Sequence, residues 1–227
     1  SGLRKTKFVF NSLAHRTKWP RCGVLSVRES PPPVAAAGLR AGYRLLRGAG
    51  ALELETGFSL PAASCLELNG WCSALIGAAA EVCPLPPASV RFCGWGEPLP
   101  VAGRSGLLEA LVLQLVCNSL LYAGPRPNLE LRLRAVGGCA HLIYADSGPG
   151  LAPDARPGFG FGAARAFARQ GGGSFAVRAG GPGFACALSL PLYPALPLLA
   201  PPQAAELVAD RFSPVYIHLA PRCILPE

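Results

Sequence analysis

The sequence predicts an α+β protein in which an N-terminal dimerising helical hairpin is followed by a two-layer α/β sandwich. Up to Leu54 the apolar residues recur at helical intervals, whereas from Phe58 short strand-like and helix-like segments alternate. A chain of 227 residues with 51% hydrophobic content can bury a sizeable core. We therefore divide the chain into a hairpin domain (1–55), a sandwich domain (56–193) and a Pro/Ala-rich C-terminal tail (194–227).

The hairpin is expected from two helical patterns separated by a proline run. The first pattern spans residues 4–28, and the Glu-Ser-Pro-Pro-Pro sequence at 29–33 must end or turn a helix there. The second runs from Val34 to about Leu54. A lone hairpin would expose its apolar faces, so we expect it to pair with a second copy in a homodimer.

The sandwich is expected to be built from three helices and seven strands. Between Asn128 and Val136 leucines alternate with charged residues, which predicts a strand with one buried and one solvated face. The predicted helices span residues 66–83, 107–122 and 161–170. The predicted strands span residues 57–60, 89–94, 99–102, 128–136, 140–146, 174–178 and 184–191.

Charge and hydropathy narrow the classes of partner. The net charge is +8, and seven of the positive charges fall in the first 28 residues. No base-reading motif accompanies that run, so we interpret it as a solvated helix face and consider nucleic acid an unlikely partner. No apolar stretch reaches the ~20 residues of a membrane span and no signal-like segment is evident, so we expect a cytoplasmic protein.

The cysteine pattern argues against a zinc centre. The nine cysteines include no Cys-x-x-Cys pair, and the three histidines do not complete a zinc-ligand pattern with them. Most of the cysteines fall within apolar runs. They are therefore expected to be small buried side chains in a reducing compartment.

Polar residues near the end of the predicted 107–122 helix suit a nucleotide. Gln114 and Asn118 are one turn apart, which places two amides on one helix face where an oxygen can help to hold Mg²⁺ between phosphates. Tyr122 closes the same helix, where its ring could stack near a base or belong to the core. Either amide alone would be a weak signal.

Two glycine-rich segments follow in the order that a nucleotide site requires. In Asp146-Ser-Gly-Pro-Gly, the carboxylate of Asp146 can accept a hydrogen bond from an exocyclic amine, and Gly148 and Gly150 allow a sharp turn close to a purine. Gly158 and Gly160 precede a predicted helix, whose free amides and dipole favour phosphate oxygens. Together with the amides these segments predict a nucleotide-binding site.

These motifs resemble those of the histidine-kinase-like ATPases, which have the Bergerat-type fold, and sensor histidine kinases are the most similar class. The N-box resembles residues 114–123, the Asp-x-Gly-x-Gly box matches 146–150 and a Gly-x-Gly box matches 158–161. The resemblance runs over roughly 57–192. It implies ATP and Mg²⁺ as cofactors, with Asn118 at the metal.

The resemblance reaches the N-terminal hairpin more faintly. A histidine followed five residues later by a proline, His15 and Pro20, resembles the phosphoacceptor box of sensor kinases. It implies autophosphorylation on His15, a catalytic part for Gln114 and relay to a response regulator of a two-component system.

Three departures from the family pattern bear on catalysis. The acidic residue after the phosphoacceptor is Arg16, which cannot act as a base at neutral pH, and the basic residue usual in the N-box is Leu121. The segment between the glycine boxes, 151–157, is short for an ATP lid. Two alternatives therefore stay open: a pseudokinase that regulates a partner by binding, and an anti-sigma-type serine kinase.

Overall fold

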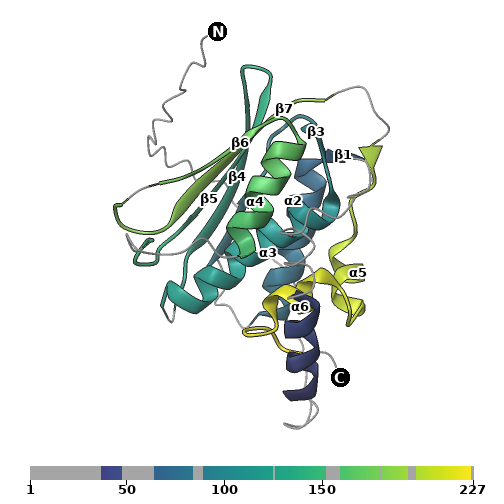
Figure 1. The fold of residues 1–227 in the computed structure, drawn as a ribbon, viewed down its shortest axis with the longest axis vertical. Coiled ribbons are helices and arrows are strands. Elements are labelled where there is room, and N and C mark those ends of the chain that lie inside the picture. Colours follow the sequence, from purple (N-terminus) through teal and green to yellow (C-terminus); the bar gives the residue numbers. More distant parts are fainter. Residues whose placement is uncertain are drawn as a thin grey trace.

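The computed structural model describes residues 37–47, 64–83, 89–124, 126–151, 159–178, 180–193 and 198–225. These residues form an α+β fold in which α2, α3 and α4 cover one face of a five-stranded sheet (Figure 1). The predicted fold class is confirmed for this part of the chain. His15, the first hairpin helix and the strand predicted at 57–60 lie outside the described residues.

The large sheet has the strand order β2-β4-β5-β7-β6. Neighbouring strands in this sheet are antiparallel, except that β2 and β4 are parallel. Gly137 and Gly138, both with positive φ, form the two-residue turn between β4 and β5, a turn type that favours glycine. The strands are β2 (Val90–Cys93), β4 (Leu129–Val136), β5 (Cys139–Asp146), β7 (Ala185–Pro191) and β6 (Ser174–Val177).

Three helices form the layer against this sheet: α2 (Leu68–Val82), α3 (Ser105–Tyr122) and α4 (Phe159–Gln170). Each begins and ends within two residues of its predicted range. By length and composition α3 could span a membrane, but 61% of it is buried inside the fold, as expected of a core helix. Its apolar residues lie on all sides because it has packing partners on more than one side.

A small second sheet was only partly predicted. It consists of β1 (Ser64–Glu67), antiparallel to β3 (Pro100–Gly103) and parallel to β8 (Leu198–Leu199). β1 was not expected from the sequence, in which the helix was predicted to start at residue 66. Glu67 ends the strand instead and caps α2, because its carboxylate accepts hydrogen bonds from the backbone amides of Asn69 (3.1 Å) and Gly70 (2.7 Å).

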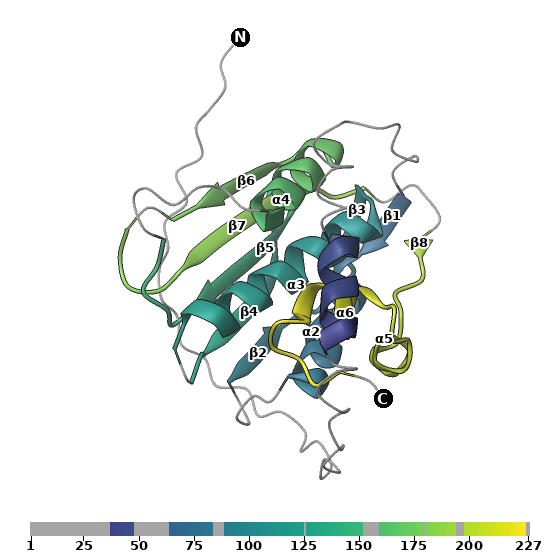
Figure 2. The ribbon, with the colours of Figure 1, turned by 60° about the horizontal axis from the view of Figure 1, so that its bottom comes forward.

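The C-terminal residues fold back onto the helical layer rather than trailing away from it. Here α5 (Ala204–Ala209) packs on α2, and α6 (Pro214–Leu219) packs on α3. The helix over residues 37–47, drawn in dark blue, lies beside α6 (Figure 2), where Tyr43 stacks on Tyr216 with 6.4 Å between ring centroids. Leu207, Val215 and Leu219 of this segment therefore belong to the core, which was not expected from the sequence.

Candidate functional site

Asp146 is held in a fixed orientation where β5 ends. Its backbone amide donates to the carbonyl of Phe184 (2.9 Å) at the start of β7. Its Oδ1 accepts hydrogen bonds from the backbone amides of Gly148 (2.8 Å) and Phe184 (3.1 Å), and its Oδ2 accepts one from the hydroxyl of Ser119 on α3. The carboxylate is therefore directed toward the helical layer.

Ser119 links this carboxylate to the core and was not singled out in the sequence. Its hydroxyl is buried and lies 2.7 Å from the hydroxyl of Tyr144, which donates to the carbonyl of Leu115 (3.1 Å). Burial raises the pKa of Tyr144 well above its usual range, so the phenol remains protonated. The one available signal was the position of Ser119 immediately after Asn118.

The glycines of the 146–150 loop allow close approach. A Cβ at Gly148 would lie 3.0 Å from Asp146 Oδ1 and 3.1 Å from the Ala123 side chain, so any side chain there would crowd the carboxylate. Gly150 has φ of +84°, and its Cβ would lie 3.2 Å from the carbonyl oxygens of Gly181 and Gly183. The loop thus packs against the turn between β6 and β7.

That turn is organised by Arg178 and Gly183. The guanidinium of Arg178 donates to the carbonyl oxygens of Pro182 and Gly183, the latter at 2.7 Å. Gly183 has φ of +73°, and a Cβ there would collide with the carbonyl oxygen of Asp146. Gly183 therefore lets β7 come close enough to fix Asp146.

The first turn of α4 lies against the middle of α3. Gly160 is buried, and a Cβ there would lie 2.9 Å from Cβ of Gln114. The first backbone amides of an α-helix lack intrahelical partners and carry the positive end of its dipole, so this turn suits an anion. Gly158 lies outside the described residues.

The three side chains predicted on α3 have different surroundings. Asn118 is exposed, and Tyr122 is 70% exposed at the helix end. Gln114 is buried, and its Nε2 lies 2.9 Å from Nδ1 of His218 on α6. Burial lowers the pKa of His218 to about 4, so the ring is neutral at pH 7 and Nδ1 can accept from the amide. Gln114 and Asn118 therefore do not share one exposed face.

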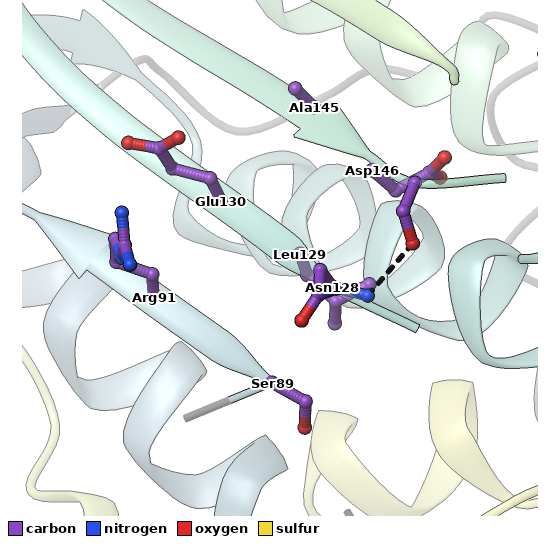
Figure 3. Close-up of a pocket in the computed structure, with 8 residues that line it drawn as sticks. Ser89, Arg91, Asn128, Leu129, Glu130, Ala145 and Asp146 are labelled. Atoms are coloured by element: carbon purple, nitrogen blue, oxygen red, sulfur yellow. Dashed lines mark hydrogen bonds between the residues drawn. The ribbon is translucent and has the colours of Figure 1, made fainter. Parts of the chain in front are cut away.

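A separate hollow of about 300 Å³ lies at the ends of β2, β4 and β5 (Figure 3). Arg91, Glu130 and Ala145 are paired across these strands and share a sheet face, while the buried Leu129 and Tyr144 belong to the opposite face. The hollow is thus mainly on the outer face of the sheet. Asp146 also lines it, but the carboxylate of Asp146 is hydrogen-bonded to Ser119 on the helical side. We do not assign the nucleotide to it.

The residues near Asp146 fit an adenine nucleotide. A carboxylate offers about four acceptor positions, and backbone amides and Ser119 use three of those on Asp146, which leaves one for an exocyclic amine. The described residues contain no cluster of three His, Cys, Asp or Glu side chains that could bind a metal alone. Mg²⁺ is often held by one or two protein oxygens together with phosphates, and the exposed Asn118 provides such an oxygen.

Comparison with known proteins identifies the fold. No family model matches the sequence. The structure is similar to the Acinetobacter baumannii histidine kinase AdeS, with a TM-score of 0.56 and 15% identity over 72% of this chain and 87% of that one. The chain has the histidine-kinase-like ATPase fold. It is also similar to full-length ShkA, solved in complex with AMPPNP, with a TM-score of 0.50 and 20% identity over 72% of this chain and 38% of that one.

The histidine-kinase-like fold agrees with the order of elements read from the sequence. The strand end at Asp146 contacts the end of α3 through Ser119, and the start of α4 contacts the middle of α3 through Gln114. Identities of 15% and 20% establish the fold and no more. The chemistry of the site has to be argued from the residues themselves.

Proposed function

We propose that the chain binds ATP with Mg²⁺ between α3, the 146–150 loop and the first turn of α4, and that it acts as a histidine-kinase-like signalling protein. The observation that supports this most strongly is the carboxylate of Asp146, which is fixed by three hydrogen bonds and retains one acceptor position. A carboxylate fixed in this way is suited to select an exocyclic amine.

Each residue of the proposed site has a separate part. Asp146 accepts the hydrogen bond from the adenine amine, and Gly148 and Gly150 keep the approach to it free of side chains. The amides near Gly160 hold phosphate oxygens, and Gly158 is proposed to take the same part. Asn118 binds Mg²⁺, which when bound neutralises charge on the phosphates. Tyr122, exposed at the end of α3, is available to stack on the base.

The proposed activity is autophosphorylation on His15 of a homodimer, with relay to a response regulator. The resemblance of the His15 segment to a phosphoacceptor box supports it. The amide of Gln114 is bonded to His218, which supports a structural part for Gln114 rather than the catalytic one.

A pseudokinase is the second candidate. Arg16 stands where a carboxylate would activate the histidine, and Leu121 stands where the N-box usually carries a basic residue. A chain with these replacements could retain ATP binding and regulate a partner through it. The two candidates share the nucleotide site and differ in phosphoryl transfer.

Two measurements on the full chain test the proposal. Calorimetry with AMPPNP and Mg²⁺ should give a saturable one-site isotherm, and the absence of binding would overturn the assignment of the site. Incubation with ATP labelled at the γ-phosphate, followed by acid, then separates the activities. Acid-labile label that is lost in His15→Ala supports the histidine kinase, acid-stable label indicates a serine or threonine kinase, and binding without label supports the pseudokinase.

A further inference from the structure

A buried contact joins the C-terminal segment, defined here as residues 204–225, to the proposed nucleotide site. His218 on α6 is 8% exposed, and its Nδ1 lies 2.9 Å from Nε2 of Gln114 on α3. Gln114 also faces the start of α4, where a Cβ at Gly160 would lie only 2.9 Å from Cβ of Gln114. Gln114 therefore lies between α6 and the turn proposed to hold the phosphates.

The C-terminal segment also holds the helix over residues 37–47. Tyr43 is 2% exposed, stacks on Tyr216 and donates a hydrogen bond to the carbonyl of Arg211 (2.6 Å). The guanidinium of Arg40 donates to the carbonyl of Ala220. Residue contacts thus link this helix to α6, α6 to α3, and α3 to the first turn of α4.

We propose that His218 is a positioning residue that orients Gln114 and thereby fixes the start of α4, so that the C-terminal segment sets the affinity for nucleotide. This inference rests on the proposed function. Without His218 the buried amide of Gln114 loses this acceptor and has to reorient to find another. Because the side chain of Gln114 packs directly on Gly160, a new rotamer of Gln114 should shift the start of α4.

The test compares three variants of the full chain by calorimetry with AMPPNP and Mg²⁺. His218→Leu removes the acceptor and should weaken binding roughly tenfold. His218→Asn places an amide oxygen near the position of Nδ1 and should bind within about twofold of the parent. Tyr216→Phe removes another hydrogen bond of α6, from the hydroxyl to the carbonyl of Val208 (3.0 Å), and should also bind within about twofold.

Amide hydrogen exchange gives a second readout that does not require nucleotide. In His218→Leu the amides of the first turn of α4 should exchange faster than in the parent, whereas in Tyr216→Phe they should not. A general loosening of the fold would instead speed up exchange equally in both variants. Equal effects in the two variants would overturn the positioning role.

A double-mutant cycle isolates the contact and keeps the test open if His218→Leu folds poorly. Gln114→Leu removes the same hydrogen bond from the other side and should weaken AMPPNP binding by a similar factor. In that background His218→Leu should have no further effect, because the coupling has already been lost. Parent-like binding by folded His218→Leu or Gln114→Leu would overturn the inference, while the absence of binding by the parent would overturn the proposed function instead.

Discussion

The hydroxyl of Ser119 on α3 donates a hydrogen bond to the carboxylate of Asp146 at the end of β5. This bond joins the helical layer to the sheet at the centre of the proposed site, and the hydroxyl of Tyr144 lies 2.7 Å from the same oxygen of Ser119. A hydrogen bond to an ionised acceptor is stronger than one between neutral groups. The orientation of Asp146 therefore depends on a residue of the N-box segment that the sequence motifs did not single out.

Ser119→Ala should lower both stability and nucleotide affinity. Removing the donor to this partly buried carboxylate should reduce the free energy of unfolding by about 1–3 kcal/mol, measured by urea denaturation. Calorimetry should show weaker ATP binding, because Asp146 is no longer held from α3. As a control, Ser213→Ala removes a buried hydroxyl that donates to the carbonyl of Leu207 (2.6 Å) and should change stability while leaving ATP affinity within about twofold. Parent-like ATP binding by Ser119→Ala would contradict the role of this bond.

Gly183→Ala should be strongly destabilising. The residue has φ of +73°, and its new methyl group would collide with the carbonyl of Asp146, so the loss should exceed about 2 kcal/mol. Gly180→Ala is the matched control, since φ is +70° but no atom lies within 4 Å of the added Cβ, and it should cost only about 1 kcal/mol. Equal losses in urea denaturation would show that backbone conformation alone requires glycine in this turn.

The packing of the helix over residues 37–47 on α6 can be tested within that helix. Tyr43→Ala removes a buried ring that stacks on Tyr216 and should reduce the free energy of unfolding by about 3–5 kcal/mol. Leu45→Ala, at a residue 77% exposed, should change it by less than about 0.5 kcal/mol. If chemical denaturation showed that Tyr43→Ala lowers the free energy of unfolding as little as Leu45→Ala, the packing of this helix on α6 would be contradicted.

The buried His218 and the partly buried Glu109 should make stability depend on pH in opposite directions. Burial lowers the pKa of His218 from 6.5 to about 4, so the unfolded chain binds more protons there and stability falls as the pH drops from 6.5 to 4. Burial raises the pKa of Glu109 from 4.5 to about 7, so stability falls as the pH rises through that range. Between pH 4.5 and 6.5 the two contributions should nearly cancel.

Variants should separate these two contributions. Glu109→Gln removes one of them, so stability should then rise by about 2 kcal/mol from pH 4.5 to 6.5. His218→Asn removes the other, so stability should fall over the same range. Urea denaturation at several pH values measures both slopes. If the free energy of unfolding had the same dependence on pH in both variants, neither group would titrate as its burial requires.

The sequence predicts the sandwich well because its signals are local. The alternation of leucine with charged residues marks β4, and the long apolar run marks α3. The C-terminal helices are six residues each, too short for a clear period, and they follow prolines and alanines that resemble a linker. Their burial follows from tertiary packing on α2 and α3, which a local pattern does not reveal.

The candidate site was predictable where a motif fixes the backbone. Asp146 lies at a strand end, and the glycines beside it allow close contacts, as their spacing indicated. The environment of Gln114 was not predictable, because its partner His218 is 104 residues away in the sequence. Asn118 and Gln114 have helical spacing but face different surroundings, since α6 covers only one of them.

The most direct test of the nucleotide site is calorimetry of Asp146→Asn with ATP and with inosine triphosphate, which carries a carbonyl in place of the adenine amine. In this variant Oδ1 can still accept from Gly148 and Phe184, so the amide nitrogen replaces Oδ2 and presents a donor to the base. The parent should prefer ATP, and Asp146→Asn should bind ATP at least about tenfold more weakly and shift its preference toward inosine triphosphate. ATP binding by folded Asp146→Asn at the strength of the parent would contradict the assignment of Asp146 as the adenine-binding residue.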